Sequence, residues 1–128
     1  MNLIVEVIAD YIAERYSGRV VEIGIGRYHR VAKRLVVYGF EVIATDLKEI
    51  DPPEGVKFYV DDVFEPDLRI YRGSSLIYSL RPPPELFVPI VRLAKLVGAH
   101  CLIRPFGNER PEGGRLVNYR GERFYVWV

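Results

Sequence analysis

The chain has 128 residues, of which 49% are apolar and 27% charged, with a net charge of +1. This balance is typical of one globular domain and argues against disorder or a general nucleic-acid-binding charge. The single cysteine, Cys101, excludes an intramolecular disulfide, and no apolar run approaches the ~18 residues of a membrane span. The N-terminus lacks the basic start and apolar core of a signal peptide. We therefore expect a single cytoplasmic domain over residues 1–128, without membrane contact.

The first predicted elements are a helix, a strand and a second helix. Apolar residues at helical spacing predict an amphipathic helix over residues 2–16, which ends near Ser17-Gly18. The apolar run at residues 20–23 then predicts a strand, and residues 28–38 again have helical spacing. Between strand and second helix lies Gly24-Ile25-Gly26. A strand, a glycine turn and a helix are the unit that presents main chain to a cofactor in Rossmann-type sheets.

The glycine turn resembles one cofactor motif more than another. The dinucleotide fingerprint G-x-G-x-x-G needs a third glycine where this chain has His29. Glu22-x-Gly24-x-Gly26 instead resembles motif I of class I S-adenosylmethionine (SAM)-dependent methyltransferases, [D/E]-x-G-x-G-x-G. The resemblance implies that Glu22, Gly24 and Gly26 contact this cofactor. Tyr28 replaces the last glycine, so it either stacks over the ligand or crowds its site. A turn that binds nothing is the alternative.

The next strand, over residues 40–45, ends at Asp46. Asp46 lies 20 residues past Gly26. In dinucleotide and SAM folds, an acidic residue at about this distance accepts hydrogen bonds from the ribose hydroxyls. We therefore predict that Asp46 binds ribose, although acidic residues are also common at strand ends. The connection over residues 47–55 contains two prolines and a glycine, so the usual crossover helix is predicted to be trimmed.

A third strand, Val56–Val60, leads to a second acidic segment. Methyltransferases that resemble this chain place an Asp after the third strand to bind the adenine amino group, with an apolar neighbour against the ring. That resemblance implies adenine contacts for Asp62, Val63 and Phe64. A plain Asx turn that ends the strand is the alternative.

The fourth strand, over residues 74–80, runs directly into Arg81-Pro82-Pro83-Pro84. A carboxyl-end loop at the middle of an α/β sheet faces the ligand crevice. Methyltransferases that act on amines carry [D/N]-P-P-[Y/F] there, and the absence of Asn or Asp directly before Pro82 disfavours an amine acceptor. Arg81 could bind a carboxylate or phosphate, or it could only cover the sheet edge. Ser79 and Arg81 are the candidate residues on the substrate side.

The last third of the chain predicts a closing hairpin. A widely apolar helix over residues 85–97 and a strand over 100–104 are followed by a polar, glycine-rich loop over 105–114, a candidate lid. Strands over 116–119 and 122–128 then form a hairpin. An antiparallel pair that closes the sheet, with the last strand beside the fifth, is the methyltransferase arrangement.

Together these patterns predict an α/β protein with a minimal Rossmann-like methyltransferase fold. Its central sheet is mostly parallel, with helices on both faces and a C-terminal antiparallel hairpin. The chain also resembles a family of small, functionally uncharacterised archaeal proteins related to methyltransferases. In that family the Glu22–Gly26 turn and the segment Tyr78–Pro83 recur, which adds Tyr78 to the predicted cofactor residues.

Three functions follow from these patterns. The first is a SAM-dependent methyltransferase of unknown acceptor, which would need a large substrate, a protein partner or a second copy because no recognition domain is left. The second is a non-catalytic nucleotide-binding or scaffold subunit. The third, an NAD(P)-binding domain, is disfavoured by the incomplete fingerprint and the hairpin ending. Nucleic acid is the weaker alternative partner because arginines scattered on a neutral chain usually form a solvated surface. No metal site is predicted.

Overall fold

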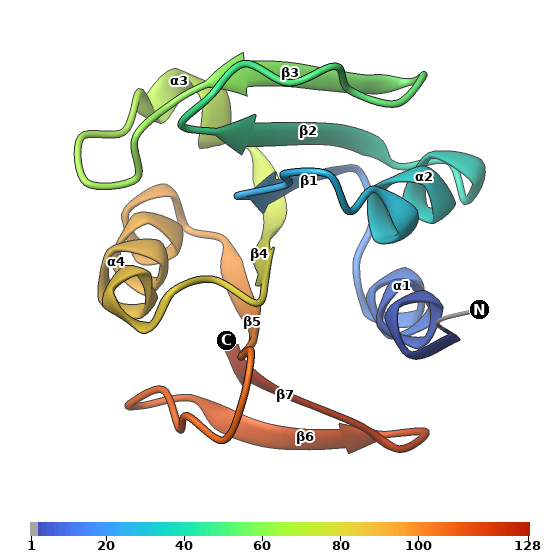
Figure 1. Cartoon of the computed structure of the whole chain (residues 1–128), viewed down its shortest axis with the longest axis vertical. Coiled ribbons are helices and arrows are strands. Elements are labelled where there is room, and N and C mark those ends of the chain that lie inside the picture. The colour runs from blue at the N-terminus through green and yellow to red at the C-terminus, as the bar shows by residue number, and fades with distance from the viewer. Residues whose placement is uncertain (1–2) are drawn as a thin grey trace.

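One seven-stranded sheet forms the middle layer of the molecule (Figure 1). The structure is a computed structural model that describes the backbone of residues 3–128 and the side chains of residues 7–128. The sheet order is β3-β2-β1-β4-β5-β7-β6. β1 to β5 are parallel, whereas β7 runs antiparallel to β5 and β6. The strands are β1 (Arg19–Ile23), β2 (Glu41–Asp46), β3 (Val56–Val60), β4 (Ser74–Leu80), β5 (His100–Arg104), β6 (Arg115–Tyr119) and β7 (Glu122–Trp127).

Helices cover both faces of this sheet, as predicted. α1 (Leu3–Arg15) and α2 (Arg30–Val37) lie on one face, whereas α3 (Leu68–Tyr71) and α4 (Phe87–Val97) lie on the other (Figure 1). A short 3-10 turn, η1 (Pro84–Leu86), precedes α4. The α/β fold, the mostly parallel sheet and the C-terminal hairpin are therefore confirmed. Within residues 3–128, no helix is long and apolar enough to cross a membrane.

Two predicted boundaries differ from the observed ones for local reasons. α2 begins at Arg30 rather than Tyr28, because the Tyr28 N–H donates to the Ile25 carbonyl (3.3 Å) and continues the glycine turn. α4 begins at Phe87, because the residues before it form a 3-10 turn in which the Leu86 N–H donates to the Pro83 carbonyl at 2.9 Å. The connection over residues 47–55 contains no helix, which confirms the trimmed crossover.

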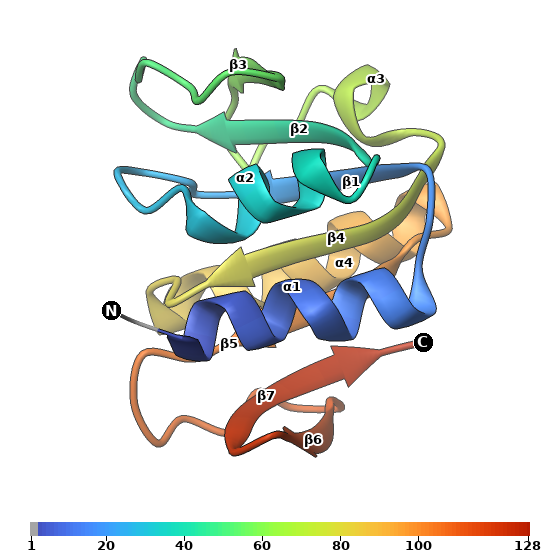
Figure 2. The ribbon, with the colours of Figure 1, turned by 90° about the vertical axis from the view of Figure 1, so that its right-hand side faces the viewer.

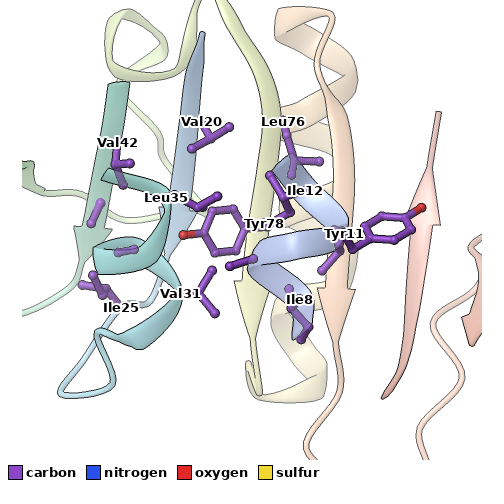
Figure 3. Packing of buried hydrophobic residues seen from close by; sticks show 14 of the residues in the cluster. Ile8, Tyr11, Ile12, Val20, Ile25, Val31, Leu35, Val42, Leu76 and Tyr78 are labelled. Atoms are coloured by element: carbon purple, nitrogen blue, oxygen red, sulfur yellow. The ribbon is translucent and has the colours of Figure 1, made fainter. Parts of the chain in front are cut away.

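The sheet separates two cores, because successive strand residues point to opposite faces. Val20 and Tyr78 pack under α1 and α2, and Figure 3 shows the Tyr78 ring between these two helices. Val21 and Cys101 pack under α3 and α4. Burial of a valine, leucine or isoleucine side chain in either core contributes about 1.5–3 kcal/mol to stability. The buried Cys101 is a core residue, as expected.

The carboxyl ends of the parallel strands gather at one edge of the sheet. β1 lies between β2 and β4, and the chain passes from the β2–β3 side back to β4, so the strand order reverses at β1. Ligands of open α/β sheets bind at such a switch point, outside the carboxyl ends of the strands. Figure 2 shows the loops after β1, β2, β4 and β5 together at its left edge, with the N-terminal end of α1 beside them. This edge is where a site is expected.

Candidate cofactor site at the carboxyl edge of the sheet

The glycine turn after β1 is tied to the end of β2. The N–H groups of Gly24 and Ile25 both donate to the Thr45 carbonyl, at 2.9 and 3.2 Å. Gly24 and Gly26 have φ angles of +73° and +52°, a region that side chains other than glycine rarely adopt. A Cβ added at either glycine would meet nothing within 4 Å. The turn is therefore rigid and presents open main-chain surface.

Asp46 lies directly beside this turn, as its spacing from Gly26 predicts. Its Oδ2 accepts a hydrogen bond from the Gly26 N–H at 2.9 Å, and its Oδ1 accepts one from the Lys48 N–H at 3.3 Å. A carboxylate has about four acceptor positions. The half-buried Asp46 side chain thus retains capacity for further donors, such as a pair of hydroxyl groups.

The same contacts disfavour a dinucleotide. A Rossmann site binds pyrophosphate with free N–H groups in its glycine loop and at a helix N-terminus. Here the N–H groups of Gly24, Ile25 and Gly26 are already donated to Thr45 and Asp46. The Asp46 carboxylate also adds negative charge where the phosphates would lie. An uncharged ribose suits this turn better than pyrophosphate does.

Glu22 and Tyr78 form a buried pair beneath the turn. They lie opposite each other on β1 and β4, and the Tyr78 hydroxyl donates to Glu22 Oε1 at 2.9 Å. Burial raises the pKa of Glu22 to about 8, since its charged form loses hydration. Burial, with the nearby Glu22 carboxylate, likewise raises the pKa of Tyr78. Only 1% of Glu22 and none of Tyr78 is exposed, so both predicted cofactor residues lie inside the core.

The acidic segment after β3 has two different roles. Asp61, which the sequence analysis did not select, accepts a hydrogen bond from the Tyr71 hydroxyl at 2.6 Å, and its N–H donates to the Asp46 carbonyl. Asp62 forms the Asx turn that was the alternative interpretation, because its Oδ1 accepts from the Phe64 N–H at 2.9 Å. Val63 is buried in the core. The adjacent Asp61 and Asp62 indicated a polar strand end, but the sequence did not show which of the two contacts Tyr71.

At the end of β4, the two candidate substrate residues differ in exposure. The Ser79 hydroxyl is buried and donates to the Ile23 carbonyl at 2.8 Å, so it holds β4 to β1. Arg81 is exposed and has a φ of +57°. Its N–H donates to the Arg104 carbonyl at 2.6 Å, and its guanidinium carbon lies 6.0 Å from the centre of the Tyr28 ring.

A hollow of about 320 Å³ lies between the glycine turn and the β4 loop, and we call it the Arg81 hollow. Ile8 and Ile25, which Figure 3 shows near the carboxyl ends of the strands, form its apolar wall together with Leu80. The remaining residues that line it are Gly24, Arg27, Tyr28, Arg81 and Arg104.

The predicted lid, residues 105–114, contains no helix, and part of it is packed. The Trp127 indole N–H donates to the Glu112 carbonyl at 3.4 Å, and a Cβ on Gly114 would lie 2.6 Å from the Trp127 ring. Its first half borders a polar hollow of about 540 Å³. Phe106 is 74% exposed there.

Among residues 7–128, no group of three potential metal ligands gathers at this edge or elsewhere.

Comparisons with other proteins identify the family. The sequence profile of the uncharacterised protein family UPF0146 matches residues 4–128. The chain belongs to this family. It is 60% identical to a UPF0146 protein of Archaeoglobus fulgidus over 93% of this chain and 91% of that one. It is 40% identical to a UPF0146 protein of Pyrococcus abyssi over 94% and 96% of the two chains. The resemblance to a small archaeal family is thereby confirmed.

Solved structures with the same fold are methyltransferases. A candidate ribosomal RNA methyltransferase from Plasmodium falciparum matches with a TM-score of 0.65 and 13% identity, over 98% of this chain and 94% of that one. A candidate SAM-dependent methyltransferase from Methanococcus maripaludis matches with a TM-score of 0.63 and 15% identity, over 96% and 83%. The glycopeptide N-methyltransferase MtfA, complexed with SAM, matches with a TM-score of 0.58 and 17% identity, over 94% and 64%. The UPF0146 protein therefore has a methyltransferase-like fold.

The site of this UPF0146 protein thus has two adjoining parts. On the β2–β3 side, carboxylates lie beside the open main chain of Gly24 and Gly26. Between the glycine turn and the ends of β4 and β5, three arginines line an apolar hollow. Such an edge can hold an uncharged sugar hydroxyl pair on one side and an anion on the other.

Proposed function

We propose that this UPF0146 protein binds SAM at the carboxyl edge of its sheet and transfers the methyl group to an acceptor. The observation that carries the proposal is the open turn at Gly24 and Gly26, which lies at the switch point between Asp46 and the Arg81 hollow. The methyltransferase-like fold supports it, since the related structure MtfA is described as a complex with SAM.

In this proposal each part of the cofactor has a named partner. The main chain of Gly24 and Gly26 faces the amino-acid end and the ribose of the cofactor. Asp46 accepts hydrogen bonds from the ribose hydroxyls with its remaining lone pairs. Asp62 and the exposed Phe64 lie at the adenine, whereas the buried Val63 anchors this segment in the core. Support for the adenine side comes from exposed apolar residues: Phe64 is 60% and Leu47 65% exposed at the ends of β3 and β2. A planar ring bound there would cover them and gain about 25 cal/mol for each Å² of apolar area removed from water.

Three predicted site residues act indirectly in this proposal. Glu22 and Tyr78 link β1 to β4 beneath the turn, and Ser79 holds the same two strands together from the other face. They are positioning residues that keep the glycine turn and the Arg81 loop in register. Tyr28 is exposed enough to contact a ligand directly, at 37%.

The cofactor would supply an electrophilic methyl group on a sulfonium. Transfer would join the methyl carbon to a lone pair of the acceptor, leave the electron pair of the broken carbon–sulfur bond on sulfur, and release the acceptor's proton to water. Such a displacement requires alignment more than a general base. The protein's contribution is therefore to hold two ligands in line at this edge.

Calorimetric titration with S-adenosylhomocysteine, with NADH as the comparison ligand, tests the proposal. We expect micromolar binding of S-adenosylhomocysteine only. Asp46→Ala should weaken it by about tenfold or more, since a hydrogen bond to a charged group contributes ~1.5–3 kcal/mol. Asp46→Asn separates the two roles of this side chain, because an amide oxygen can still accept from the Gly26 N–H but carries no charge. Asp51→Ala, an exposed carboxylate in the same connection, is the matched control.

A non-catalytic nucleotide-binding or scaffold subunit is the second candidate. It is favoured by Tyr28 in place of the last glycine and by the lack of Asn or Asp before Pro82. If neither ligand binds the wild-type protein, this candidate replaces the methyltransferase. If NADH alone binds, the protein is a dinucleotide-binding domain and the proposal is wrong.

A further inference from the structure

The Arg81 hollow combines apolar walls with two cations that have no carboxylate partner among residues 7–128. The charge of Arg104 is balanced, because its Nε donates to the buried Glu122 carboxylate at 2.6 Å. Arg27 and Arg81 are both exposed, and neither is within ion-pair distance of a carboxylate of residues 7–128. Two unbalanced guanidinium groups beside an apolar wall are a binding surface for an anion that has a carbon skeleton.

The backbone of Arg81 is strained. Arg81 and Arg120 are the two residues other than glycine with positive φ in residues 3–128, at +57° and +49°. Arg120 is in the turn between β6 and β7, and its guanidinium is paired with Asp10 at 3.0 Å. No carboxylate of residues 7–128 is within ion-pair distance of Arg81, which also precedes Pro82 and is further restricted by it. Unfavourable backbone that is held by its surroundings is typical of functional positions.

Two contacts hold Arg81 at the hollow. Its N–H donates to the Arg104 carbonyl at 2.6 Å, which joins the β4 loop to the end of β5. Its guanidinium lies 6.0 Å from the centre of the Tyr28 ring, at the limit of a cation–π interaction. The tyrosine that replaces the last glycine of the motif thus lies next to this cation.

A guanidinium group donates hydrogen bonds and accepts none. An Asn or Asp before the prolines could accept hydrogen bonds from an amine, whereas Arg81 repels a protonated amine and pairs with a carboxylate or phosphate. We propose that the Arg81 hollow binds the methyl acceptor, and that this acceptor is a molecule with an apolar body and a carboxylate or phosphate group held by Arg81 and Arg27. This inference rests on the proposed function and names the substrate class of the same site.

The test is an NMR titration of the full chain at about 0.1 M salt with three ring compounds of similar size: phenyl phosphate, benzoate and benzylammonium. We expect the two anions, but not the cation, to shift the amide signals of Gly24, Ile25 and Tyr28. A stronger effect of phenyl phosphate would identify a phosphate-bearing acceptor, and a stronger effect of benzoate a carboxylic acid. Equal binding of benzylammonium would overturn the inference, as would shifts confined to residues 106–110 at the neighbouring polar hollow.

Matched variants separate binding from folding. Arg81→Gly removes the guanidinium and relieves the backbone strain, so it should bind the anions at least tenfold more weakly without loss of thermal stability. Arg120→Gly makes the same change at the paired arginine and should bind like the wild type. Arg81→Lys keeps the charge but not the bidentate geometry and should be intermediate. Unchanged anion binding by Arg81→Gly would overturn the inference.

A titration with S-adenosylhomocysteine distinguishes this inference from the proposed function. We expect Arg81→Gly to bind it with wild-type affinity. If this variant loses S-adenosylhomocysteine binding, Arg81 holds the amino-acid carboxylate of the cofactor, and the acceptor assignment is wrong while the cofactor proposal stands. If the wild type binds the anions but not S-adenosylhomocysteine, the cofactor proposal is wrong, and the acceptor assignment falls with it.

Discussion

The loops after β2 and β3 and the loops after β1 and β4 meet at one edge of the sheet, but the first group carries carboxylates and the second guanidinium groups, and the two are held differently. In the first group, the oxygens of Asp46, Asp61 and Asp62 accept hydrogen bonds from neighbouring main-chain N–H groups. In the second, Arg27 and Arg81 extend into an open hollow. We conclude that the acidic part is preorganised by the fold, whereas the basic part has its charge available for a ligand.

The Glu22–Tyr78 pair links β1 to β4, and the titration of Glu22 should have the largest effect on stability. The pKa of Glu22 rises from 4.5 to about 8 on folding, so between these pH values the folded state binds the additional proton. The free energy of unfolding should therefore fall as pH rises from 4.5 through 8, by up to about 1.4 kcal/mol per pH unit from this group. Glu22→Gln should remove this slope. Denaturant unfolding of both proteins at pH 5, 7 and 9 measures it, and parallel pH curves would contradict the assignment.

A substitution at Gly26 tests whether the turn beside Asp46 must keep its conformation and its open surface to bind S-adenosylhomocysteine. Gly26→Ala places a Cβ in the left-handed region, at a cost of about 1–2 kcal/mol, and covers the open main chain. We expect both a lower melting temperature and a loss of S-adenosylhomocysteine binding of about tenfold or more. Gly98→Ala at the end of α4, where φ is +75° and the surroundings are equally open, should lose similar stability but keep binding. Equal loss of binding in both variants would indicate a global effect.

Removal of the Tyr71–Asp61 hydrogen bond shows how much this side-chain contact contributes to the stability of the loop after β3. Tyr71→Phe removes the donor to Asp61 Oδ2 and should lower the free energy of unfolding by about 1–2 kcal/mol. Tyr59→Phe, at a 38% exposed position on β3, should change it by less than about 0.5 kcal/mol. Chemical denaturation of the two variants gives this difference. Similar values for both would mean that the Tyr71 hydroxyl contributes nothing to the edge.

Substitution of Arg81 should have the smallest effect on stability, and it should stabilise the protein, whereas the variants above destabilise it. Arg81→Gly should raise the free energy of unfolding by about 1 kcal/mol, because glycine adopts positive φ without strain. Arg120→Gly also relieves strain but loses its ion pairs with Asp10 and Glu14, so its net change should be near zero. Thermal denaturation compares the two. A destabilised Arg81→Gly protein would indicate that Arg81 supports the fold rather than a ligand.

Most strand ranges and one half of the site could be predicted from the sequence. β3, β4 and β5 match their predicted ranges, because each is an apolar run bounded by glycine, proline or charged residues. The glycine turn and the position of Asp46 beside Gly26 were also predictable. Both follow from a local strand–turn–helix–strand unit whose geometry is short-range.

Only the tertiary structure decided which polar residues face solvent and which face the core. Glu22 and Tyr78 are 56 residues apart, and they became a buried pair because β1 and β4 are neighbours and α1 and α2 cover that face. Strand periodicity separates two faces, but it does not show which face a helix covers. In the same way Arg27 and Arg81 come from the loops after β1 and β4, Arg104 comes from the last position of β5, and the sheet order brings all three to one hollow.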